Sequence, residues 1–556
     1  MIIGKGQHSD PSGLLLGYYD LTTQTDLWQH QLKGEHSLGK RGIKFKWTGS
    51  YVLLDKQKPD NHQMMVNVVE NDKLESNEFN ISAPFSSGIS AGALRWWSRA
   101  YEKNFNWDAA VSVPFNFSPG NFVSQNIFKA GYAGWRKDRV FYVLNTGSQN
   151  YNTSDYPPLA EAFSPGRGGN IYISDFSDDF HRKASLHGMY LMLDNKIGNK
   201  WRLVWGVRGE YYNLNGANEA LDSLFHYINQ SRNPDEKFDY TELLNREPNW
   251  NFFPSANLTY SLTPMMNLRL AYSKSIIRPD LREMSFFREY DFELGGIYQS
   301  ELVKSTIAHH YDFRYEWYPG AGEVLSASLF YKKFDYSMEI YNDEQSGGIF
   351  ELRNNKNAKN YGLEIEVRKS LGFTKVPVLR NIILYGNFTA LKAYVTPMSV
   401  NYNAVDPNNP LKVTPIETVG AEERRPQTGA SNYMVNAGIF YDIKPASFSL
   451  VYNYISNRMF RPDSKYIWSL YERPLESLDA QLAFRFMQQK GEVKFNIANL
   501  LNSSSLVYRN NYSDAEITNN GKTPSTKELL YQNGKDLINY EAKPGRTYSI
   551  TISYKF

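Results

Sequence analysis

Only a few short motifs in this sequence have the residue types and spacing that covalent chemistry needs. The stretch GISAG (88–92) matches the G-x-S-x-G pattern of hydrolases, in which Ser90 would be the nucleophile. That pattern works at a sharp turn between a strand and a helix, whereas here it lies in a Ser/Gly-rich loop before a strand-like segment, ALRWWSRAY (93–101). No histidine has a context that would supply the base. We therefore predict no catalytic residue and no enzymatic activity.

Metal and cofactor sites also lack a complete motif. The chain contains no cysteine, which excludes disulfides and thiolate metal sites. His309 and His310 are adjacent on a predicted strand, so their side chains point to opposite faces and cannot bind one metal ion together. The stretch GRGG (166–169) lacks the Lys-Ser/Thr ending of a phosphate-binding loop, and GKT (521–523) lacks its upstream glycine. We predict neither a cofactor nor a metal.

Composition narrows the class of protein further. With 61 basic and 58 acidic residues the net charge is +3, and no tract suits nucleic acid, so we predict no nucleic-acid partner. Aromatic residues make up 15% of the chain, including 40 tyrosines, which is high for a soluble enzyme. No apolar run approaches the ~18 residues of a membrane helix. The first residues, MIIGKGQHSDPSG (1–13), lack the apolar core of an export signal, so we expect a cytoplasmic protein or a fragment without its front end.

The main structural signal is strict alternation of apolar and polar residues. In the closing TYSITISYKF (547–556), residues Tyr548 to Phe556 at every second position are apolar or aromatic, and the residues between them are Ser, Thr or Lys. Side chains alternate across a strand, so such a segment has one apolar face. Counting similar segments predicts roughly 17 strands, many near the ~10 residues that cross a bilayer at a tilt. Further examples are IKFKWTGSYVL (43–53), WRLVWGVRGEYY (201–212), MNLRLAYS (266–273), GLEIEVRK (362–369) and LDAQLAFRF (478–486).

The connections between these strands alternate in length. Short turns are predicted at 37–42, 194–200, 261–265, 318–322 and 441–446, and long polar stretches at about 54–92, 146–183, 214–248, 279–303, 396–428 and 503–544. A soluble sandwich, jelly roll or propeller would also alternate, with its apolar face in a core. Strand length, alternating connections and aromatic residues near strand ends favour a membrane barrel with a polar lumen. A propeller would need a repeat of ~40–50 residues, which is absent.

One region adds a resemblance to a known family. The run NFFPSANLTYSLTPMMNLRLAYSKSIIRPDLREMSFFREYDFE (251–293) resembles the hallmark stretch of TonB-dependent receptor barrels. The matching elements are Phe253-Pro254, Arg269, Tyr272, Arg278-Pro279, Arg282-Glu283 and Asp291. Segments 311–334, 357–369, 433–442, 470–484, 495–502 and 544–556 resemble later strands of that family, in order. GGIYQSEL (295–302) departs from it, because the family usually has a Gly-Asn-Pro-like turn there.

The resemblance implies an all-β fold: a transmembrane antiparallel up-and-down β-barrel, with roughly 17 strands here of 22 in the family's barrel. Residues 1–25 would be a loop or partial strand, and 26–556 the C-terminal part of the barrel. The plug domain, the energy-coupling box and the export signal would be missing from this chain. We interpret Arg278, Glu283 and Glu364 as parts of the barrel's architecture, and not as substrate contacts.

The resemblance also implies a function and a location. The chain would be the barrel of a receptor in the outer membrane of a Gram-negative cell, importing a bulky, scarce nutrient such as a siderophore, cobalamin, glycan or peptide. Its partners would be outer-membrane lipids, the nutrient, the TonB complex acting through the missing plug, the barrel assembly machinery and a possible surface lipoprotein. Tyr554 and Phe556 would belong to the assembly signal.

Two questions stay open from the sequence. The alternative functions are a passive outer-membrane channel and a hydrolase built on a similar barrel. We expect the long loops, for example YNTSDYPPL (151–159) and EYYNLNG (210–216), to form the binding surface, because tyrosine gives amphipathic contact area suited to sugars or aromatic siderophores. No individual substrate-binding residue is identified.

Overall fold

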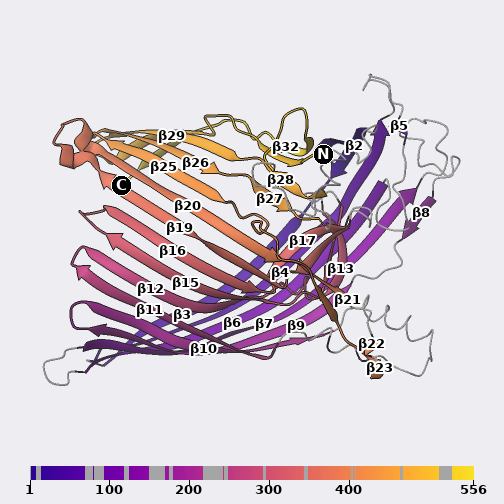
Figure 1. Cartoon of the computed structure of the whole chain (residues 1–556), viewed down its shortest axis with the longest axis horizontal. Helices are drawn as coiled ribbons and strands as arrows, with labels where there is room; N and C mark the ends of the chain where they lie inside the picture. The colour runs from indigo at the N-terminus through magenta and orange to yellow at the C-terminus, as the bar shows by residue number, and fades with distance from the viewer. Residues whose placement is uncertain are drawn as a thin grey trace.

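The computed structural model is built around one large antiparallel β-sheet, which curls so that the N-terminal strands lie behind the C-terminal ones (Figure 1). None of the helices in the described part of the chain is long and apolar enough to span a membrane. The structure describes residues 2–555 except 8–13, 40, 69–78, 81–92, 118–123, 150–169, 174–178, 217–238, 240–241, 243–247, 292–295, 344–348, 402–404, 407, 464–467 and 512–528.

The sheet contains 21 strands, and four short ones extend it locally: β1 (Ile2–Gln7), β2 (Leu14–Asp20), β5 (Phe79–Asn80) and β8 (Asn170–Ile173). The other 17 strands form an up-and-down meander in which each pairs antiparallel with the next, so the predicted fold class is confirmed. They are β3 (Gln24–Leu38), β4 (Ile43–Val68), β6 (Ala93–Phe117), β7 (Ser124–Gln149), β9 (Phe180–Ile197), β10 (Trp201–Asn215), β11 (Trp250–Thr263), β12 (Met266–Ile277), β15 (Thr306–Trp317), β16 (Val324–Asp335), β19 (Asn357–Ser370), β20 (Ile382–Thr396), β25 (Tyr433–Asp442), β26 (Ala446–Ile455), β29 (Leu475–Phe486), β30 (Gly491–Ala498) and β33 (Thr547–Tyr554).

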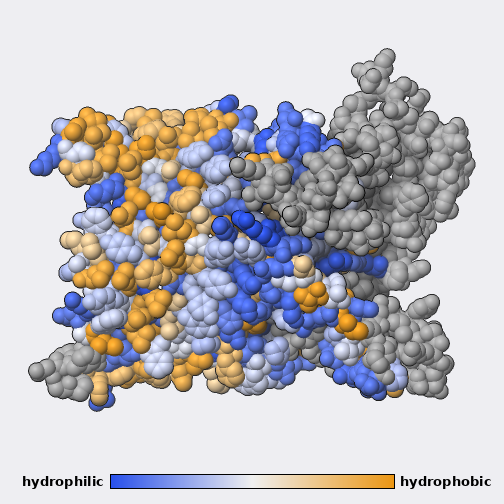
Figure 2. All heavy atoms as spheres, in the orientation of Figure 1, coloured by the Kyte–Doolittle hydropathy of each residue, from blue (hydrophilic) through white to orange (hydrophobic). Residues whose placement is uncertain are grey.

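The outer face of the meander is apolar. The predicted alternation holds in β10, where Trp205 and Val207 are 46% and 43% exposed but Glu210, on the other face, is only 7% exposed. Figure 2 shows hydrophobic side chains gathered over the long strands and hydrophilic ones toward the end with the long connections. Monomeric soluble proteins rarely expose a contiguous apolar patch larger than about a few hundred Å². An apolar surface spread over this many strands therefore needs an apolar surrounding.

The inner face carries charged residues in pairs. Arg269 on β12 lies 2.8 Å from Glu316 on β15, and Arg314 on β15 lies 2.7 Å from Glu366 on β19. Arg269 and Glu316 lie on paired strands, whereas Arg314 and Glu366 meet across the intervening β16, so the inner wall is a network of cross-strand ion pairs. Glu316 is buried, but the other three side chains are 30–46% exposed, and pairs that exposed contribute little stability. The pairs mainly make the inner wall polar.

The two ends of the meander differ as predicted. Tight connections join β3 to β4, β9 to β10, β11 to β12, β15 to β16 and β25 to β26 at one end. At the same end β19 and β20 are joined through two short 3-10 turns, η3 (Leu371–Thr374) and η4 (Leu379–Asn381). We call the opposite end, with the long connections, the loop end. There β4 continues to Val68, so the prediction that a loop begins near residue 54 is wrong; the strand simply extends beyond its apolar part.

The long connections also contain strands, which the sequence did not predict. One four-stranded sheet joins β13 (Phe286–Asp291), β14 (Gly296–Glu301), β18 (Ile349–Asn354) and β17 (Met338–Asp343), with β14 and β18 parallel. A second joins β27 (Arg458–Arg461), β28 (Leu470–Glu472), β31 (Ser505–Arg509) and β32 (Leu537–Ala542). Two hairpin-like pairs are β21 (Met398–Asn401) with β24 (Ile416–Val419), and β22 (Val405–Asp406) with β23 (Asn409–Val413). The divergent stretch 295–302 therefore includes β14.

Candidate functional site

The segment after β12 folds back into the mouth of the barrel. Pro279 cannot donate to a strand ladder, which ends β12 at this point. Asp280 N–H then donates to the Glu283 carboxylate at 2.8 Å, and Met284 N–H donates to the Asp280 carbonyl at 3.0 Å, closing a turn. This turn places Leu281 and Met284, each 3% exposed, against the inner wall. Their apolar cluster also contains Ala184, Leu186, Tyr212 and Leu214, with Trp135 packed beside it.

Ion pairs fasten the same segment to the wall. Arg278 lies 2.8 Å from Glu210 of β10, and Asp280 pairs with Arg139 of β7. Burial raises the pKa of the Asp280 carboxyl, but the Arg139 guanidinium lowers it by more, so the pKa lies below its usual range. The segment is thus held by both apolar packing and charge.

The four-stranded sheet continues this packing. Phe287 of β13 and Tyr298 of β14 lie in one buried cluster with Val303 and Leu352. The Arg282 guanidinium lies over both rings, at 5.0 Å from Phe287 and 5.2 Å from Tyr298. Burial, with Glu283 nearby, raises the pKa of the Tyr298 phenol. The inserted segment and β13–β14 therefore form one packed body.

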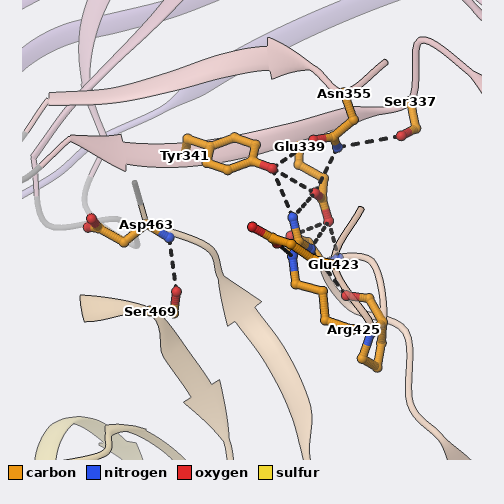
Figure 3. Close-up of polar contacts among 10 residues, drawn as sticks. Ser337, Glu339, Tyr341, Asn355, Glu423, Arg425, Asp463 and Ser469 are labelled. Carbon is orange, nitrogen blue, oxygen red and sulfur yellow. Dashed lines mark hydrogen bonds and ion pairs between the residues drawn. The ribbon is translucent and has the colours of Figure 1, made fainter. Parts of the chain in front are cut away.

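A buried polar network lies at β17, the edge strand of that sheet opposite β13 (Figure 3). The Glu339 carboxylate on β17 accepts from both terminal nitrogens of Arg425, at 2.8 and 3.1 Å. It also accepts from Asn355 Nδ2 at 2.8 Å and from the Thr428 backbone N–H at 2.7 Å. Arg425 in turn donates to the Tyr341 hydroxyl at 2.8 Å. The network joins the β24–β25 connection to β17 and β18.

Both charges of this network are almost fully buried. Burial raises the pKa of Glu339, but the positive charge of Arg425 and the hydrogen bonds from Arg425, Thr428 and Asn355 lower it by more. Glu339 is therefore ionised at neutral pH, and its partner stays protonated. Removing one partner of a buried pair leaves an uncompensated charge, which typically costs about 3–5 kcal/mol.

A third connection is tied to the same sheet. The Asn342 side chain on β17 donates to the Asp463 carboxylate at 2.8 Å, and its backbone N–H donates to the Pro462 carbonyl at 3.2 Å. Arg461 of β27 lies 4.2 Å from the Phe350 ring centroid on β18. The β26–β29 connection therefore rests on β17 and β18.

A fourth contact links β24 to residues that lie near the start of β17. Lys304 and Lys356 each lie 2.9 Å from the Glu417 carboxylate. Both ammonium groups lie over the Tyr336 ring, which has a left-handed backbone with φ of 58°. Burial raises the pKa of Glu417, but hydrogen bonds from the two lysines lower it by more. Four long connections are thus joined into one assembly at the loop end.

Within the described residues no group of three or more His, Asp or Glu side chains could hold a metal ion. His309 and His310 lie on opposite faces of β15, as predicted: His309 contacts Tyr272 on the outer face, at 3.2 Å, and His310 contacts Ser275 on the inner face, at 2.9 Å. EYYNLNG (210–216) was predicted to belong to a long loop, and that prediction is wrong, because β10 continues to Asn215. The segment contributes Glu210 to the wall pair with Arg278.

Several sequence predictions fall outside the described residues: the motif with Ser90, GRGG (166–169), GKT (521–523), YNTSDYPPL (151–159) and Phe556. Tyr554 ends β33 on its apolar face. Sequence reasoning missed Glu339 and Arg425. The one available signal was a charged residue between two apolar ones in SMEIY (337–341), which does not identify a partner 86 residues away.

Comparisons with known proteins bear on this architecture. A family model described as TonB dependent receptor-like, beta-barrel, matches residues 5–500. No curated protein sequence matches the chain. Among solved structures, the ferric citrate transporter FecA in its unliganded form is 14% identical, with a TM-score of 0.54 over 99% of this chain and 74% of that one. At that identity the likeness concerns the fold alone.

Two further receptors are less similar in structure. The ferric-catecholate import receptor Fiu from E. coli K12 is 12% identical, with a TM-score of 0.42 over 98% of this chain and 80% of Fiu. A mutant of the ferric enterobactin receptor PfeA from Pseudomonas aeruginosa is 10% identical, with a TM-score of 0.40 over 100% of this chain and 80% of PfeA.

Proposed function

Since this chain belongs to the family of TonB-dependent receptor-like β-barrels, we propose that it forms the barrel of a receptor that imports a bulky, scarce nutrient across the outer membrane. The family consists of outer-membrane transporters that work with TonB, not of enzymes. The nutrient is a siderophore, cobalamin, glycan or peptide, captured at the loop end. Outer-membrane lipids meet the apolar outer face, and residues 26–556 form the integral barrel.

One observation carries the proposal: an apolar outer surface backs a polar inner wall, and long connections pack against that wall at the loop end. A passive channel needs an open path, whereas here residues 278–285 pack Leu281 and Met284 against the inner wall. Connections packed into one body at the loop end suit a receptor that captures a ligand there. In this proposal a plug moved by the TonB complex opens the path, and a surface lipoprotein is a possible further partner.

Uptake in cells tests this function. Cells expressing the full-length protein are offered labelled ferric siderophores, cobalamin, oligosaccharides and peptides in separate assays, with and without active TonB. We expect one class to enter only when both the protein and TonB are present. Entry of small solutes of every class without TonB would instead indicate a passive channel.

The end of the chain has a proposed role in assembly. Tyr554 and Phe556 form the signal read by the barrel assembly machinery, because they are the last two aromatic residues of the sequence and Tyr554 ends β33. Deleting Phe556, or replacing Tyr554 by Ser, should lower the amount of heat-modifiable barrel in the outer membrane. Replacing Tyr548, which lies on the same face of β33 but further from the end, is the control. Equal losses from the control would contradict a specific terminal signal.

A further inference from the structure

Tyrosines form a row across four adjacent strands on the outer face. Register pairs Tyr272 of β12 with Tyr311 of β15, Tyr311 with Tyr331 of β16, and Tyr331 with Tyr361 of β19. Ring centroids of the first two neighbouring pairs lie 5.0 and 6.0 Å apart. The four residues are one continuous aromatic row, which we call the tyrosine row.

The rows on either side of the tyrosine row differ in polarity. Two residues further from the loop end, register aligns Leu270, Phe313, Leu329 and Leu363, which are all apolar. Two residues nearer the loop end, it aligns Lys274, His309, Lys333 and Lys359, which we call the basic row. Two residues along a strand correspond to about 6.6–6.8 Å. Apolar, amphipathic and basic layers therefore follow one another within about 14 Å.

This layering can be seen on the surface. Over these strands Figure 2 passes from hydrophobic through pale to hydrophilic side chains toward the loop end. Tyrosine rings concentrate where a membrane's hydrocarbon meets its headgroups. If the tyrosine row marks that boundary, then the basic row lies at the depth of the headgroups.

The basic row has more positive charge than its own carboxylates neutralise. Lys333 lies 3.0 Å from Asp335, and Lys359 lies 2.7 Å from Glu422. Lys392 of β20, exposed and in register with Tyr361, adds a fourth lysine at the end of the tyrosine row, next to the basic row. The two ion pairs are 33–44% exposed, and exposed pairs are weak. A phosphate can therefore compete with these carboxylates for the lysines.

We propose that the outer face of β12, β15, β16, β19 and β20 at the loop end binds the phosphorylated headgroup of an anionic lipid. Lysine ammonium groups bind phosphate, their aliphatic stems lie along apolar surface, and the tyrosine row supports the upper part of the acyl chains. The inference rests on the proposed function in one respect, since it requires this face to meet a membrane.

Lipid binding to the whole protein tests the proposal. The protein is reconstituted in phosphatidylcholine nanodiscs containing one-fifth phosphatidylglycerol, and retained lipids are counted by native mass spectrometry. The variant carries Lys333→Gln, Lys359→Gln and Lys392→Gln. We expect the wild type to retain phosphatidylglycerol in preference to phosphatidylcholine, and the variant to lose most of that preference, by at least about threefold.

A matched control removes the same charge from the inner face. The control variant carries Lys44→Gln, Lys56→Gln and Lys332→Gln. These three lysines lie on inner positions of β4 and β16, and Lys332 directly precedes Lys333. This control should retain the wild-type preference. The proposal is overturned if the outer variant keeps its anionic lipid, or if the control loses as much.

The outcomes also separate this inference from the proposed function. Heat-modifiable migration of every variant shows whether the barrel is folded. A folded, inserted protein that retains both lipids equally overturns the lipid site alone. A protein that does not enter nanodiscs at all overturns the membrane function, and with it this inference.

Discussion

Glu339 and Arg425 lie 86 residues apart in the chain and form an ion pair whose side chains are only 1% and 6% exposed. Glu339 belongs to β17, and Arg425 to the connection before β25. Asn355 and Thr428 also donate hydrogen bonds to the Glu339 carboxylate. The pair therefore fixes the position of two long connections relative to each other. The loop end therefore behaves as one packed unit and not as separate loops.

Removing one charge of this pair should loosen the loop end. Glu339→Gln removes the buried counter-charge of Arg425 and leaves its guanidinium only the exposed Glu423 carboxylate, 2.8 Å from Nε. We expect a loss of up to about 3–5 kcal/mol in the local stability of β17 and β18. Hydrogen exchange of these two strands measures the change, while exchange in the barrel strands should be unaffected. Replacing both residues by apolar ones, Glu339→Leu with Arg425→Met, should restore much of the protection.

The control for that variant is an exposed ion pair in the barrel wall. Lys46 and Glu35 lie 3.0 Å apart, with side chains 59% and 52% exposed. Glu35→Gln should leave hydrogen exchange unchanged, because exposed pairs add little. If Glu35→Gln and Glu339→Gln have equal effects, burial is not what makes the Glu339 pair important.

Acid should loosen the loop end through the same carboxylate. The pKa of Glu339 is lowered in the folded protein from its ordinary value of 4.5, so its stabilising contribution is complete above pH 4.5 and is lost as pH falls through the lowered folded value. Cleavage by an acid-active protease is followed from pH 6 down to pH 2. Cleavage near β17 should begin to rise below pH 4.5. Glu339→Gln should be cleaved equally across this pH range. A wild type that shows no rise would contradict the prediction.

The inserted segment should depend on its apolar contacts. Leu281→Ala removes a buried side chain from the cluster with Leu186 and Tyr212, which should cost about 2–5 kcal/mol of packing. We expect residues 278–285 to become accessible to added protease in intact cells. Met284→Leu, which keeps the volume, should change accessibility little. Unchanged protection in Leu281→Ala would mean that the ion pairs alone hold the segment.

One glycine in the barrel wall should be indispensable for assembly. Gly362 of β19 is in register with Phe330, whose ring lies over it, and an added Cβ would lie 2.7 Å from the ring and would also collide with the Ala390 carbonyl. Gly362→Ala should therefore reduce the folded, heat-modifiable fraction in the outer membrane. The matched control is Gly49→Ala on β4, where an added Cβ meets nothing within 4 Å. Equal yields of the two variants would contradict the prediction.

Local patterns predicted most of the barrel. In 266–273 and 362–369 the alternation correctly predicted both the strand and the face of each side chain, because a period of two is a property of the backbone alone. The prediction failed where apolar residues run out, as at the continuation of β4 to Val68. It also failed for β13 and β14, since short strands among polar residues resemble loops.

The loop-end site could not be predicted in the same way. Ion pairs such as Asp280 with Arg139 join residues 141 positions apart, and nothing in either segment specifies the other. The tyrosine row is an intermediate case. Each tyrosine was visible in its own strand, but the alignment of Tyr311 with Tyr331 and Tyr361 depends on register.

The all-β class, about 17 strands, the apolar face of each strand and the family resemblance could all be predicted from the sequence. Each depends on residues close together in the chain. Three features depended on the folded chain: which strands stand in register, which charges share a buried site, and that Leu281 and Met284 pack against the inner wall. Those features depend on distances between segments remote in sequence. The chain fixes such distances only when the whole sheet has formed.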